Sequence, residues 1–161
     1  MVAQKLNLLH ILLLLSAGAC LYSAVWEARQ RTVALRNHFR SSGFAIVTAL
    51  VLMFFQVGMK QPYWLFLAAV AGGLVAGGAS GLVLKLRVDR SWQIPQPAGA
   101  RNVIWMAALL AAFAAVDIAG AAIGPEARAW RFYAAFGAAG CAGLVFGRAI
   151  AMAIRVWRLI G

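Results

Sequence analysis

The fold of this chain is decided by the uncharged stretch Tyr63–Leu84, which reads YWLFLAAVAGGLVAGGASGLVL. A helix needs about 20 mostly apolar residues to cross the hydrocarbon core of a bilayer, which is about 30 Å thick. The stretch has that length and that composition. It follows Pro62, a residue that suits the first turn of a helix because its missing N–H needs no partner there. The stretch therefore predicts a membrane-spanning helix.

Four more runs of the same kind flank this stretch. The chain of 161 residues is 64% hydrophobic and only 12% charged, which is about half the charged share of a soluble domain. A soluble protein of this composition would have no polar shell left to cover five such helices. We therefore predict an all-α, polytopic transmembrane bundle in which residues 1–161 form a single domain. The predicted spans are residues 6–26, 43–59, 63–84, 103–123 and 132–153.

The net charge of +11 comes from 15 Lys and Arg against 4 Asp and Glu, and the positions of these charges predict an orientation. Cytoplasmic loops of membrane proteins carry an excess of Lys and Arg. Most of the basic residues fall in the first and third loops, near the inner end of the fifth run and in the C-terminal tail. We therefore predict a bacterial inner-membrane protein with its N-terminus outside and its C-terminus in the cytoplasm.

The first run contains a competing signal. Ala17-Gly18-Ala19-Cys20 resembles a lipoprotein cleavage site, but apolar residues continue beyond Cys20, and cleavage would leave the arginines of the first loop on the wrong face. An uncleaved span is the preferred interpretation. Cys20 and Cys141 are the only cysteines, and without a C-x-x-C motif they predict small buried side chains rather than a redox pair.

Three polar side chains fall at a similar depth on the outer side of the predicted bundle: His10, Gln56 and Asp117. An aspartate inside a bilayer is expensive, so it usually faces the bundle interior and finds a partner. The cluster is therefore either a hydrogen-bonded clasp between helices or a proton-linked or ligand-binding site. We predict no cofactor and no metal, although His10 leaves open the axial ligation of a haem or a chlorophyll-type pigment.

Small residues recur every four positions in the third and fifth runs. In lipid, small residues let two helix backbones approach closely, so the spacing predicts tight helix packing. It does not identify whether the partner helix belongs to this chain, to a second copy or to another protein. The central residues of the two rows are Gly73, Gly77, Gly81, Gly143 and Gly147.

The segment 28–42 is expected to continue the first helix into the cytoplasm. On such a helix Arg29, Arg36 and Arg40 would fall on one side, where each would contribute about 1 kcal/mol to contact with anionic lipid headgroups. The ordinary cytoplasmic excess of basic residues explains the same charges without a specific lipid site. No aromatic platform or nucleic-acid-binding module accompanies them, so we expect no nucleic-acid partner.

Motifs of catalysis are absent from the sequence. It has no P-loop, no H-E-x-x-H and no G-x-S-x-G, and three of its four carboxylates lie at run ends or in loops. We therefore predict that the chain is not an enzyme.

From the third run onward, the sequence resembles a known pattern. The glycine row leads into Leu86–Asp89 (LRVD), then into Ile94–Gly99 (IPQPAG), and then into another span. Together with the arginine-rich first loop, this is similar to small bacterial multi-spanning proteins of the CcdC-like group, which is associated with cytochrome c biogenesis. The resemblance implies a small multi-pass membrane protein and carries no catalytic motif.

Two functional hypotheses follow from the sequence. The first is a non-enzymatic accessory, assembly or scaffolding subunit of a membrane complex, or a homo-oligomer, whose partners are other membrane proteins and anionic lipids. The alternative is a small proton-linked transporter or carrier centred on Asp117 and His10.

Overall fold

The computed structural model describes residues 8–30, 32–56, 63–83, 93–95 and 100–160, and most of these are helical. Five helices are long and apolar enough to cross a membrane, which confirms the predicted all-α architecture of a multi-pass membrane protein. The helices are α1 (Leu8–Arg29), α2 (Leu35–Gln56), α3 (Tyr63–Val83), α4 (Ala100–Ile123) and α5 (Arg128–Ile160).

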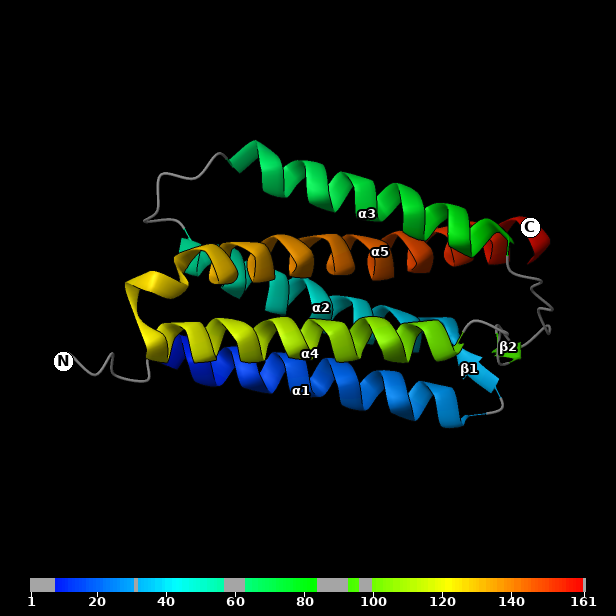
Figure 1. Ribbon diagram of the computed structural model, residues 1–161. Coiled ribbons are helices and arrows are strands. Elements are labelled where there is room, and N and C mark those ends of the chain that lie inside the picture. Colours follow the sequence, from blue (N-terminus) through cyan, green and yellow to red (C-terminus); the bar gives the residue numbers. More distant parts are fainter. Residues whose placement is uncertain (1–7, 31, 57–62, 84–92, 96–99, 161) are drawn as a thin grey trace.

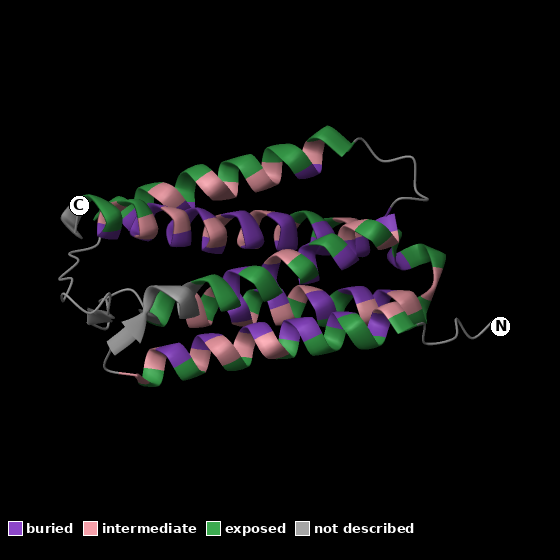
Figure 2. Cartoon of the chain, turned by 180° about the vertical axis from the view of Figure 1, so that it is seen from behind, coloured by how far each residue is buried: buried purple, intermediate pink, exposed green. Residues whose placement is uncertain are grey.

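The five helices run alongside one another in alternating directions, with α5 in the middle of the bundle (Figure 1). α5 packs against α2, α3 and α4, while α1 lies against α2 and α4. Burial follows this arrangement, because α5 is the most buried of the five spans and α3 is the most exposed (Figure 2). Large apolar side chains such as Leu67, Val75 and Trp157 point away from the bundle. This is the distribution expected where lipid tails surround the protein instead of water.

Glycines set the contact between α3 and α5. A Cβ atom added to Gly77 would overlap the backbone of Leu144 on α5, and one added to Gly143 would overlap the backbone of Val70 on α3. The two predicted rows therefore pack on each other within one chain, because only glycine lets the two backbones come so close. The glycines whose added Cβ would meet the opposite helix in this way are Gly73, Gly77, Gly81, Gly143 and Gly147.

The connection between α1 and α2 differs from the prediction. α1 ends at Arg29, and the chain then forms strand β1 (Thr32–Ala34), which pairs antiparallel with strand β2 (Gln93–Pro95) from the α3–α4 connection. α2 begins at Leu35, earlier than the predicted second span. The expectation that residues 28–42 continue the first helix is therefore wrong. Two of the three β1 residues are β-branched and favour extended backbone, and the pairing holds both connections at one end of the bundle.

A tight turn joins α4 to α5. Gly124 has a φ of 105°, a left-handed conformation that side-chain-bearing residues rarely adopt. The 3-10 turn η2 (Pro125–Ala127) follows it and leads directly into α5. With 33 residues, α5 is about 50 Å long. The turn brings the first residues of α5 back beside the last turns of α4.

Candidate functional site

The most buried charged residue in the described ranges is Asp117 on α4, whose exposed fraction is 0%. Arg131 on α5 donates a hydrogen bond from Nε to its Oδ1 at 2.9 Å, and a second from Nη2 to its Oδ2 at 3.5 Å. Gly120 makes room for the arginine stem, since an added Cβ there would lie 2.6 Å from Cγ of Arg131. The two charges thus neutralise each other out of water, through two hydrogen bonds that fix their relative orientation.

Arg131 was not predicted as the partner of Asp117, although the sequence contains a signal for the pair. Both residues lie seven positions from Gly124, one before it and one after it. Seven residues are about two helical turns, so a tight turn at Gly124 places both side chains at the same height. The residue pair can be found by counting outward from the Gly-Pro break.

The other two members of the predicted cluster lie on α1 and α2. His10 is buried, and its ring lies against that of Phe55 in a tilted arrangement, with ring centroids 4.7 Å apart. Gln56 follows Phe55 directly and is 2% exposed. The ends of α1, α2 and α4 that carry the three predicted residues meet at one end of the bundle (Figure 1). Within the described ranges, however, no hydrogen bond or ion pair joins Asp117 to His10 or Gln56.

Unpaired polar atoms remain at this end of α1 and α2. Nδ1 of His10 and both polar atoms of the Gln56 amide are buried and have no hydrogen-bond partner among the residues that the structure describes. Buried polar atoms are ordinarily paired in proteins. His10 and Gln56 could therefore bind a further polar group. Asp117 could not do so in the same way, because its carboxylate is already paired with Arg131.

A line of polar contacts that the sequence analysis missed joins α1 to α2 in mid-bundle. Thr48 donates to Oγ of Ser16 at 2.9 Å, and Sγ of Cys20 approaches the carbonyl oxygen of Ser41 at 3.5 Å. Hydroxyl groups that bond across helices stabilise membrane bundles modestly. Serine and threonine inside the first two runs are the only signal for these contacts in the sequence.

Two more buried charged residues, Glu27 and Arg148, lie at the end of the bundle where α1 ends. Glu27 and Arg148 are each 5% exposed, and Glu27 lies close enough to the guanidinium to interact with it electrostatically. Nε and Nη2 of Arg148 have no hydrogen-bond partner among the described residues. Arg148 also lines a small cavity of about 10 Å³ with Ser41 and Ser42, which is about the volume that one water molecule needs.

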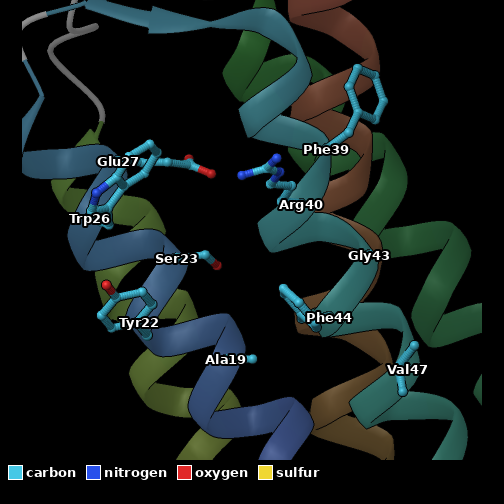
Figure 3. Close-up of a pocket in the computed structure, with 10 residues that line it drawn as sticks. All are labelled: Ala19, Tyr22, Ser23, Trp26, Glu27, Phe39, Arg40, Gly43, Phe44 and Val47. Atoms are coloured by element: carbon cyan, nitrogen blue, oxygen red, sulfur yellow. The ribbon is translucent and has the colours of Figure 1, made fainter.

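A much larger groove, of about 790 Å³, opens between α1 and α2 beside Glu27 (Figure 3). Figure 3 shows Glu27 of α1 and Arg40 of α2 pointing toward each other across it, with Tyr22 and Trp26 beside them on α1. Arg40 forms no ion pair with any residue that the structure describes. The size of the groove is that of sites for small organic ligands.

The three arginines predicted to contact anionic lipid do not share one helix. Arg29 lies in the last turn of α1 and is exposed, whereas Arg40 lies on α2 and lines the groove. Arg36 belongs to α2, and its side chain lies outside those described. Because β1 interrupts the helix, the predicted basic face is divided between α1 and α2. Arg40, on α2, lines the groove.

No group of three or more His, Cys, Asp or Glu side chains that would hold a metal ion occurs in the part of the chain that the structure describes. No family model, curated protein or solved structure matches this chain. The resemblance to the CcdC-like group therefore stays a prediction.

Proposed function

We propose that this multi-pass membrane protein is a non-enzymatic assembly or accessory subunit, which joins its complex through the outer face of α3. The observation that carries the proposal is a second row of small residues on α3, on the face turned away from α5. Its members recur every four positions and are all exposed: Ala68, Gly72, Ala76 and Ser80.

The first glycine row of α3 is already covered by α5, so it is not available to a partner. The second row is open, since an added Cβ at Gly72 would meet nothing within 4 Å. The hydroxyl of Ser80 donates to the carbonyl oxygen of Gly77 at 2.7 Å, so this face presents no unpaired hydroxyl hydrogen to lipid. Such a face lets the backbone of another helix approach closely.

The partner helix that we propose is α3 of a second copy. A row of small residues at four-residue spacing is complementary to itself when two copies are related by a two-fold axis, which is the commonest symmetry of oligomers. Two parallel α3 helices would then place Gly72 and Ala76 opposite their counterparts.

Cysteine cross-linking in native membranes tests this arrangement. In a chain carrying Cys20→Ala and Cys141→Ala, we expect Ala76→Cys to form a disulfide-linked dimer on mild oxidation. Ala112→Cys, on an exposed position of α4, serves as the control and should not cross-link. Adding Gly72→Leu should abolish the dimer, whereas Gly18→Leu, at another glycine with open space around it, should leave it intact. The proposal would be overturned if Ala76→Cys gave no disulfide-linked dimer, or if the dimer still formed after Gly72→Leu was added.

A proton-linked carrier is the second candidate, favoured by the unpaired buried atoms of His10 and Gln56. The Asp117–Arg131 pair weighs against it, because both carboxylate oxygens of Asp117 already accept hydrogen bonds from Arg131. Asp117→Asn separates the two functions: a carrier would lose proton-coupled uptake in vesicles while staying folded, and an assembly subunit would keep its cross-linked dimer.

A further inference from the structure

We propose that the groove between α1 and α2 binds one anionic phospholipid, with its phosphate beside Arg40 and an acyl chain between the two helices. This site is independent of the α3 surface proposed above and lies on different helices.

The walls of the groove change character along their length. Glu27 and Arg40 lie toward the end where α1 and α2 are connected, whereas Ala19 and Val47 lie deeper along the helices (Figure 3). From Glu27 to Ala19 the helix rises about 12 Å, at about 1.5 Å per residue. The groove therefore has a charged end at Glu27 and Arg40, passes Ser23, and becomes apolar toward Ala19 and Val47. This order matches the headgroup and the first part of the acyl chain of a lipid.

Small residues create the apolar part of the groove. Gly43 lies in the wall formed by α2, and an added Cβ there would meet nothing within 4 Å. Ala19 faces the groove from α1, and the ring of Phe44 borders the space between them (Figure 3). Unlike the glycines of the α3–α5 contact, Gly43 therefore opens a space that none of the described helices fills.

The charge at the polar end favours an anion. Among the described residues that line the groove, Glu27 is the one acidic side chain. Arg148 interacts with it from the bundle interior, and Arg40 faces it across the groove. Among the side chains that the structure describes here, two guanidinium groups stand against one carboxylate. A phosphate group that enters beside Arg40 gains a charge-assisted hydrogen bond, and a headgroup without further positive charge does not repel the arginines.

The occupant is a lipid rather than a helix or a free phosphate ester. A helix is about 10–12 Å wide, and the volume of about 790 Å³ is that of a small amphipathic molecule. The aromatic side chains of Tyr22 and Trp26 border the polar end, as they do where proteins meet lipid headgroups. A free phosphate would leave the apolar stretch beside Ala19 and Gly43 unoccupied.

Native mass spectrometry of the detergent-solubilised chain tests the site. The probes are a phosphatidylglycerol and a phosphatidylcholine with identical acyl chains, and glycerol 3-phosphate as the headgroup alone. We expect one phosphatidylglycerol per chain to stay bound under conditions that remove phosphatidylcholine. Arg40→Gln should weaken its binding about fivefold, which is the factor for one charge near the membrane surface, about 1 kcal/mol. Gly43→Leu should remove the bound lipid.

Two matched variants serve as controls. Arg158→Gln removes an exposed charge near the end of α5, and Gly18→Leu adds a side chain at an exposed position outside the groove lining; both should keep the bound lipid. Equal retention of the two lipids, or equal losses for Arg40→Gln and Arg158→Gln, would show a diffuse charged surface and overturn the proposal. Displacement by glycerol 3-phosphate, or a dimer that Gly43→Leu separates, would overturn it in favour of a free phosphate ester or a second copy.

Discussion

Asp117 and Arg131 form a bidentate ion pair across the α4–α5 hairpin. Each lies seven residues along the chain from Gly124, in the turn that brings them together. The pair is buried, with the Asp117 side chain 0% exposed and the Arg131 side chain 11% exposed. A charge at this depth that loses its partner is strongly destabilising, whereas a pair that is replaced as a whole by apolar side chains costs little. The geometry is that of a clasp between helices.

Removing one member of the clasp should therefore destabilise the protein more than removing both. We expect Asp117→Leu alone, and Arg131→Leu alone, each to lower the free energy of unfolding by about 3 kcal/mol. The double variant should recover most of that loss. Thermal or denaturant unfolding in detergent, followed by circular dichroism, measures all three variants. A double variant that is as unstable as the sum of the single ones would contradict a direct pair.

Two adjacent glycines of α3 give a matched test of the α3–α5 contact. Gly77 faces the backbone of Leu144, whereas Gly78 has nothing within 4 Å of an added Cβ. Gly77→Ala should lower the free energy of unfolding by about 1–3 kcal/mol, the usual cost of overpacking. Gly78→Ala should be neutral or stabilising by up to about 1 kcal/mol, because alanine is the better helix former. Equal effects of the two substitutions, measured by unfolding in the same detergent, would contradict the interlocked rows.

The turn before α5 provides a third prediction. Gly124 has a φ of 105° and nothing within 4 Å of an added Cβ, so the cost of Gly124→Ala is conformational and not steric. We expect a loss of about 1–3 kcal/mol from backbone strain. Gly18→Ala, within the helical part of α1 and equally free of contacts, is the control and should lose nothing. If the unfolding midpoints of the two variants coincide, the left-handed turn does not form in the membrane.

The number and order of the helices could be predicted from the sequence because each span is determined by the length and apolar composition of its own run of residues. A run of apolar residues long enough to cross a bilayer is visible without knowledge of its neighbours, and the predicted run Tyr63–Leu84 contains all of α3. The breaks at Pro62 and Gly124 were equally local. The earlier start of α2 at Leu35 was missed because most of residues 35–42 are polar or charged and do not resemble a span, although they belong to the same helix.

Side-chain partners were harder to predict because they depend on how helices turn toward one another. His10, Gln56 and Asp117 lie at a similar depth in the predicted membrane, which follows from the number of residues between each of them and the end of its span. Depth alone does not determine which side chains of neighbouring helices face each other. Arg131 became the partner of Asp117 through the geometry of the turn at Gly124. The groove beside Arg40 was not predicted at all, because a space between two helices leaves no residue pattern.

The orientation of the bundle is a prediction from the charge distribution, and cysteine labelling in intact cells tests it. In the background of Cys20→Ala and Cys141→Ala, Glu126→Cys places a thiol in the exposed α4–α5 turn, and Arg158→Cys places one at the exposed end of α5. Because the arginine-rich connections are expected in the cytoplasm, a membrane-impermeant maleimide should label Glu126→Cys in intact cells. Arg158→Cys should react only after the membrane is permeabilised. The reverse pattern would invert the bundle and move the lipid groove beside Arg40 to the outer leaflet.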